Sequence, residues 1–141
     1  MPVESDLLGT WRLVSLGRAH AATGEEIPDH PRTGFITFAP GNRMMTILVW
    51  ADRAAPADEV PTDAERIALH KSVIAFAGDY TVHPDRLVFH VDVSWNESWT
   101  GSQQVRFSRF EGNRMTLTTE PHRSSTDGID SVFRQVWEKM S

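Results

Sequence analysis

The residues most capable of chemistry lie close together, on two neighbouring strand-like segments between residues 86 and 110. His90 and Asp92 lie on the first segment, and Gln104 and Arg106 lie on the second. An imidazole can donate or accept a proton near neutral pH, and a guanidinium binds a carboxylate or a developing oxyanion. We therefore name His90, as acid or base, and Arg106, as anion clamp, as candidate catalytic residues, with Gln104 and Asp92 as ligand-binding partners.

The pairing of these two segments decides whether the four side chains meet. A turn centred near Ser98 places His90 opposite Arg106, about 5 Å apart at Cβ, and Asp92 opposite Gln104 on the same face. The other face then carries apolar residues, namely Leu87, Phe89, Val91, Val93, Val105 and Phe107. Either the polar face meets water around a packed interior, or it points inward and forms a site. A shift of one residue in register would undo the pairing.

The elements that must position these residues read as eight short strands separated by turn signals. We expect them at 7–17, 34–39, 43–50, 73–82, 86–94, 102–110, 114–119 and 131–138. Eight antiparallel strands can close into a barrel whose interior is packed or holds one small ligand. The prediction is an all-β, eight-stranded antiparallel up-and-down barrel, with residues 1–141 forming a single domain.

One short helix interrupts this pattern between the third and fourth strands. Thr62 and Glu65 have the spacing of a capping box, and residues 64–71 are good helix formers. Ile67 and Ile74 give the segment an apolar stripe. We expect this helix to lie across one end of the barrel as a lid, with 51–61 as a connecting loop.

Composition excludes several classes of function. The 141 residues include 14 Lys and Arg against 19 Asp and Glu, without a basic cluster, so nucleic acid and anionic membranes are not expected partners. Cysteine is absent, which excludes disulfides and thiolate chemistry. The six histidines show no close paired spacing, so we expect no metal, and without a glycine-rich phosphate loop we expect no cofactor. The amino terminus lacks the features of a signal peptide, which favours a cytoplasmic location.

Several ordered segments resemble the lipocalin-like domain family, stand-alone calycin-type proteins of bacteria and fungi. They are GTWRLVS at 9–15, GFITF at 34–38, FAGDY at 76–80, His90 followed by WTGSQQVR at 99–106, and VWE at 136–138. The resemblance implies an eight-stranded barrel around a cavity. It also favours an inward orientation of His90 and Arg106, because both lie in matched stretches. Unlike secreted lipocalins, the chain has no disulfide and carries an inserted helix.

Aromatic residues supply further site candidates. Trp11 is expected to close the barrel floor, with Arg134 or Arg106 packed on its ring. The Tyr80 hydroxyl either binds a substrate oxygen or belongs to a core tyrosine. Trp99 and Phe38 complete the candidate ligand-binding set.

Three functions remain open at this level. The first is a cofactor-independent acid-base enzyme of the isomerase, cyclase or lyase type, acting on a small, mostly apolar molecule with a carbonyl or carboxylate. The second is a non-catalytic carrier of a lipophilic metabolite. The third is a packed barrel that acts as an interaction module through Trp95 and Trp99, and a homodimer through that hairpin is also expected.

Overall fold

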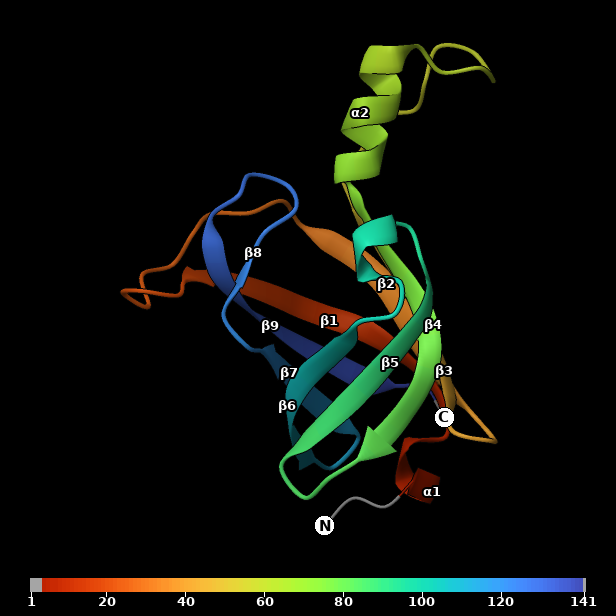
Figure 1. Cartoon of the computed structure of the whole chain (residues 1–141), viewed down its shortest axis with the longest axis vertical. Helices are drawn as coiled ribbons and strands as arrows, with labels where there is room; N and C mark the ends of the chain where they lie inside the picture. Colours follow the sequence, from red (N-terminus) through yellow and green to blue (C-terminus); the bar gives the residue numbers. More distant parts are fainter. Residues whose placement is uncertain (1–3, 141) are drawn as a thin grey trace.

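The computed structural model describes residues 4–140, and they form a closed antiparallel barrel (Figure 1). The barrel strands are β1 (Gly9–His20), β2 (Arg32–Ala39), β3 (Arg43–Trp50), β4 (Val73–Val82), β5 (Arg86–Ser94), β6 (Gln103–Glu111), β7 (Arg114–Thr119) and β9 (Asp130–Lys139). Each strand pairs with the next, and β9 pairs with both β7 and β1, which closes the sheet. The two-residue strand β8 (His122–Arg123) pairs with the start of β9. The predicted eight-stranded barrel is confirmed.

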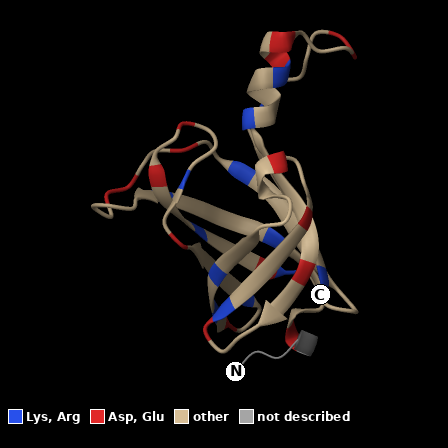
Figure 2. Cartoon of the chain, in the orientation of Figure 1, with Lys and Arg blue, Asp and Glu red and all other residues tan. Residues whose placement is uncertain are grey.

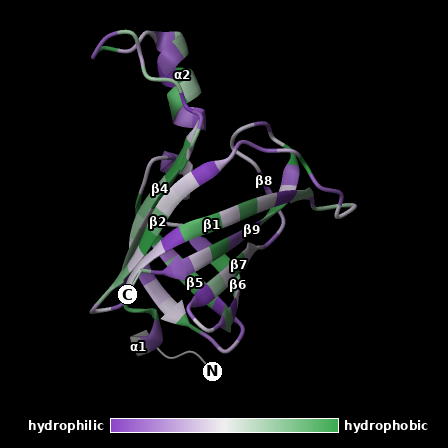
Figure 3. Ribbon diagram, turned by 180° about the vertical axis from the view of Figure 1, so that it is seen from behind, coloured by the Kyte–Doolittle hydropathy of each residue, from purple (hydrophilic) through white to green (hydrophobic). Residues whose placement is uncertain are grey.

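Hydrophobic and hydrophilic residues alternate along the barrel strands (Figure 3), and such alternation places one set inside the barrel and the other on its surface. In β3, for example, Met44, Thr46 and Leu48 are buried, whereas Met45 and Ile47 between them are exposed. Four strands, β3, β4, β5 and β7, have the bounds expected from the sequence. Turn residues and period-two alternation therefore predict the bounds of these four strands correctly.

One end of the barrel is closed by the short helix α1 (Glu4–Leu7). Leu7 is fully buried, and its carbonyl oxygen accepts a hydrogen bond from Nε1 of the buried Trp11 at 2.9 Å. The cation over the Trp11 ring is Lys139, with its Nζ 5.6 Å from the ring centroid. The expectation of Arg134 or Arg106 at this place is wrong, because Arg134 lies on the exposed side of β9 and Arg106 faces the opposite half of the interior.

The helix α2 (Asp63–Lys71) lies between β3 and β4, as predicted. Its capping box is formed: the Glu65 amide donates to Thr62 Oγ1 at 3.2 Å, and the Thr62 amide donates to Glu65 Oε1 at 2.8 Å. The helix does not lie across the barrel end, however. It projects beyond it (Figure 1), buries none of its residues and leaves Ile67 60% exposed. The reason is that β4 begins only two residues after Lys71, so the helix extends outward from the strand.

Charged residues of both signs are interspersed over the strands and loops (Figure 2). An example on the outer surface is Arg43, which pairs with Asp79 at 3.0 Å and with Asp92 at 2.6 Å. Within residues 4–140, no helix has both the length and the apolar character needed to cross a membrane.

The close approach of β4 and β5 gives a first testable prediction. At Gly78 the register of the two strands shifts, and an added Cβ would overlap the backbone carbonyl of His90. Gly78→Ala should therefore lower the free energy of unfolding by about 2 kcal/mol or more. Gly17 in β1 has open space at its Cβ position, so Gly17→Ala is the matched control. Equal denaturant midpoints for the two variants would contradict this account of the β4–β5 contact.

Candidate functional site

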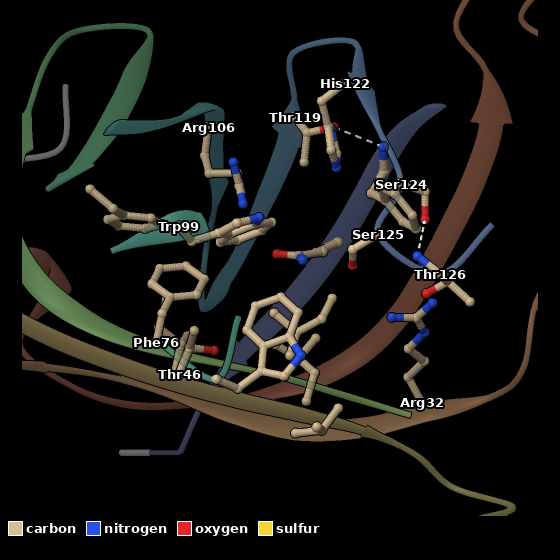
Figure 4. A pocket seen from close by; sticks show the side chains of 18 of the residues that line it. Arg32, Thr46, Phe76, Trp99, Arg106, Thr119, His122, Ser124, Ser125 and Thr126 are labelled. Carbon is tan, nitrogen blue, oxygen red and sulfur yellow. Dashed lines mark hydrogen bonds between the residues drawn. The ribbon is translucent and has the colours of Figure 1, made fainter. Parts of the chain in front are cut away.

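A cavity occupies the half of the barrel opposite α1 (Figure 4). Its volume is about 40 Å³, enough for a few water molecules. Its walls are mainly apolar, from Ile36, Leu48, Phe76, Phe89, Phe133 and Trp137, and the polar side chains facing it include Arg106, Thr119, His122 and Gln135. The site thus combines apolar and aromatic walls with polar side chains on several sides, and small-molecule sites commonly contain both kinds of group.

The pairing of β5 with β6 differs from the predicted register. Leu87 lies opposite Arg106, and Phe89 lies opposite Gln104. The connecting loop is asymmetric, because residues Glu97–Trp99 form the 3₁₀ turn η1 and the Asn96 side chain accepts from the Ser98 amide. The polar residues of β6 consequently share the inner face with the apolar residues of β5.

His90 and Asp92 therefore lie on the outer side of the barrel, and the predicted juxtaposition of His90 with Arg106 is wrong. His90 Nε2 lies 3.3 Å from Thr81 Oγ1. Asp92 is bound by Arg43, and this hydrogen bond holds the pKa of the Asp92 carboxyl below its usual value. Neither side chain lines the cavity.

Arg106 is the most unusual residue of the site. It is only 6% exposed and points from β6 toward the cavity (Figure 4). Its Nη1 donates to the carbonyl oxygen of Val105 at 3.1 Å and more weakly to Gln104 Oε1 at 3.5 Å, and among residues 4–140 it forms no ion pair. Burial lowers the pKa of the guanidinium to about 10, against the opposing attraction of the Glu120 carboxylate, so the group is still a cation at neutral pH.

Gln104 holds Arg106 in place through a short chain of hydrogen bonds. Gln104 Nε2 donates to Ser102 Oγ at 3.0 Å, and the Ser102 hydroxyl donates to the carbonyl oxygen of Trp99 at 2.6 Å. The amide oxygen of Gln104 is thereby turned toward the guanidinium. Trp99 itself lines the cavity and packs on Phe76, with ring centroids 5.6 Å apart.

The other arginines near the cavity contrast with Arg106 because each has a carboxylate. Arg18 binds both Asp127 oxygens, at 2.8 and 2.7 Å, and Arg32 binds Asp29 at 2.7 Å. Both guanidinium groups also lie near the ring of Phe133, at 5.4 and 5.7 Å from its centroid. Their charges are neutralised by hydrogen-bonded carboxylates, whereas the carboxylate that acts on Arg106, that of Glu120, forms no hydrogen bond with it in the described part of the chain.

His122 faces the same cavity and was not among the candidates taken from the sequence. Its Nδ1 lies 3.1 Å from the carbonyl oxygen of Glu120. Burial lowers the pKa of the imidazole, and the charges of Arg106 and Arg18 act in the same direction, against the opposing effects of the Glu120 carbonyl and Asp130. No sequence signal marks this residue, because β8 has only two residues and shows no periodicity.

Besides Asp92, two further predicted ligand-binding residues lie outside the cavity. Phe38 and Tyr80 are buried in the packed half of the barrel, with their rings edge to face at 5.0 Å between centroids. Neither contributes to the cavity wall. Of the predicted ligand-binding residues, Trp99 lines the cavity. Gln104 does not line it but is hydrogen-bonded to Arg106, which does.

A wider groove continues from the cavity to the surface. It has a volume of about 560 Å³ and runs between the loop that holds η1 and residues 124–128. Trp99 and residues 124–126 belong to both the groove and the cavity. These residues therefore form the entrance. In the described part of the chain, His, Asp and Glu do not gather into a group of three that could hold a metal.

The geometry defines a small calycin-type barrel, closed at one end and hollow at the other, which is a small-molecule-binding fold. A family model described as a lipocalin-like domain matches residues 8–140, so the chain belongs to the lipocalin-like domain family. A crystal structure of an uncharacterized protein from Bacteroides eggerthii DSM 20697 is similar at 13% identity and a TM-score of 0.43, covering 94% of this chain and 98% of that one. No curated protein matches the chain.

The unpaired charge of Arg106 gives a second prediction. The guanidinium has a lower pKa in the folded chain than its ordinary value of 12.5, so at pH 7, where both states are protonated, burial of the charge destabilises the fold by roughly 3 kcal/mol. This penalty diminishes only as the pH rises through about 10. Arg106→Met fills similar volume without charge and loses two modest hydrogen bonds.

We therefore expect Arg106→Met to raise the free energy of unfolding at pH 7 by about 1–3 kcal/mol. Arg134→Met removes the same formal charge from the exposed side of β9 and should change stability little. Thermal unfolding of both variants measures the difference. A loss of stability in Arg106→Met would mean that the charge is already compensated inside the barrel.

Proposed function

We propose that this barrel binds a small, mostly apolar molecule that carries a carboxylate or another anionic group. The observation that supports this proposal is the buried Arg106, which faces the cavity and, among residues 4–140, is hydrogen-bonded to no carboxylate. The anionic group of the ligand would bind Arg106, and the rest of the ligand would contact the aromatic walls.

Electrostatics favour this assignment. A buried cation without a partner is costly, and folding has already removed Arg106 from water. An incoming anion gains a charge-assisted, bidentate interaction in a low dielectric, which contributes about 1.5–3 kcal/mol. Because Gln104 already orients the guanidinium, little additional ordering is required on binding.

The apolar walls provide the remaining affinity. Phe76, Phe89, Phe133 and Trp137 surround the cavity, and each Å² of apolar ligand surface that they cover contributes roughly 25 cal/mol. The cavity of about 40 Å³ is smaller than such a ligand. Binding therefore requires an outward movement of Trp99 or of residues 124–126, which line both the cavity and the groove.

An acid-base enzyme that uses His90 together with Arg106 is a different function. The two side chains lie on opposite sides of the barrel wall, so a molecule bound inside the barrel would contact only Arg106. The binding proposal accordingly does not use His90 or Asp92.

The homodimer expected from Trp95 and Trp99 stays a prediction. Both indoles line the cavity, whereas the outer surface of β2 to β5 exposes other apolar side chains, namely Phe35, Met45, Ile47 and Val93. A dimer contact would bury this surface more readily than the hairpin. Sedimentation at several protein concentrations tests whether the chain associates.

A matched pair of fluorescent probes tests the anion site. 1-Anilinonaphthalene-8-sulfonate and N-phenyl-1-naphthylamine share one aromatic skeleton, and only the first carries a sulfonate. We expect Arg106→Met to weaken binding of the sulfonate probe by about 10- to 100-fold, since the lost charge-assisted contact is about 1.5–3 kcal/mol. Binding of the neutral probe should be nearly unchanged. Fluorescence titration gives both dissociation constants.

Arg134→Met is the control for net charge, and it should leave both titrations as in the wild-type protein. If Arg106→Met leaves the preference for the sulfonate probe unchanged, the anion does not bind at Arg106 and the proposal is wrong. If neither probe binds the wild-type protein, the barrel is a packed domain rather than a container.

A further inference from the structure

We infer that His122 is a proton acceptor for the molecule that Arg106 holds, so that the cavity can abstract a proton from a carbon next to a carbonyl or carboxylate group. This inference rests on the proposed function and deepens it. The observation behind it is the juxtaposition of the two side chains, which extend from β6 and β8 toward one cavity (Figure 4).

The hydrogen bond of His122 fixes which ring nitrogen accepts the proton. A backbone carbonyl oxygen can only accept, so the contact of Nδ1 with the Glu120 oxygen at 3.1 Å requires the proton to be on Nδ1. In the neutral ring, Nε2 then carries the lone pair. Nε2 has no hydrogen-bond partner within residues 4–140, and the ring lines the cavity. The basic nitrogen is therefore available to a bound molecule.

The surroundings keep this imidazole neutral at physiological pH. The groups that act on it are Arg106 from β6, Arg18 from β1, Asp130 from β9 and the backbone of Glu120. Burial and the two arginines outweigh the carboxylate, and the pKa of His122 is lowered. A neutral histidine at pH 7 is ready to accept a proton.

The reaction that this pair can perform needs no co-reactant. The C–H bond next to the carbonyl breaks, its proton goes to His122 Nε2, and the electron pair moves onto the carbonyl oxygen. Arg106 stabilises the resulting enolate by charge and hydrogen bonds. Return of the proton to another carbon, or loss of a leaving group from the neighbouring carbon, completes an isomerisation or an elimination.

The base can be tested without the natural substrate. 5-Nitrobenzisoxazole is a flat, apolar molecule that opens to a coloured phenolate when a base removes the C–H proton of its isoxazole ring. The C–H electron pair forms the third carbon–nitrogen bond of a nitrile as the N–O bond breaks, and the electron pair of the N–O bond ends on the phenolate oxygen. We expect the wild-type protein to catalyse this opening, with kcat/KM rising with pH to a plateau. The half-point should lie below the ordinary pKa of histidine, about 6.5.

His122→Ala should reduce kcat/KM by about 100-fold, which is the usual contribution of a positioned base. His83 lies in the turn between β4 and β5, at the α1 end of the barrel, and His83→Ala is the control that should keep the full rate. Binding of 1-anilinonaphthalene-8-sulfonate is measured on the same variants. Retained sulfonate binding in His122→Ala would show that the cavity is intact.

The outcomes separate the two proposals. If the wild-type rate equals that of His122→Ala while the sulfonate still binds through Arg106, His122 is not a base and the binding function stands. If the rate falls in His90→Ala instead, the base lies on the outer surface and this inference is wrong. If the sulfonate does not depend on Arg106, the binding proposal fails independently of the rate.

Discussion

The buried charge of Arg106 is the constraint on which the hollow half of the barrel depends. A guanidinium in an apolar interior needs hydrogen-bond acceptors and a route for an opposite charge. The chain supplies the first through Val105 and Gln104. The cavity beside the guanidinium provides the route by which an opposite charge can reach it. The polar groups around it, the entrance at Trp99 and the imidazole of His122 all take their significance from that one buried charge.

Much of the fold could be predicted because its signals are local. Turn residues punctuate the chain, and the strands between them alternate with period two. The helix was equally clear, since Thr62 and Glu65 form the capping box that their spacing predicts. What local signals could not determine was where the helix goes. Its direction follows from how soon β4 begins, and Ile67 alone is too small an apolar surface to draw the helix onto the barrel.

The site was harder to predict because it depends on how β5 pairs with β6, and on which face of each strand points inward. Period-two alternation does not say which face of a strand points inward when both faces carry apolar residues. In β6, Val105 and Phe107 alternate with Gln104 and Arg106, and the apolar pair is the one that faces outward. The same ambiguity explains the error over Arg134, since apolar residues occur at both parities along β9. His122 could not be found at all, because only the pairing of β8 with β9 brings it to the cavity.

One half of the barrel is packed with apolar side chains and the other half contains the cavity. This division explains how the fold remains stable with a buried cation inside it. Near α1 the interior is filled by large apolar side chains, among them Leu7, Trp11, Phe38 and Tyr80. Close packing there contributes stability that does not depend on the other end. The hollow end can therefore carry a buried cation that no carboxylate of the described residues hydrogen-bonds, together with polar groups that face a cavity. The packed end offsets the energetic cost. Because β1 pairs with β9, each of the eight barrel strands is hydrogen-bonded on both sides. The strands that surround the cavity are therefore also held by the pairing of the packed half. In the proposed function, a bound anion offsets the electrostatic cost of burying Arg106.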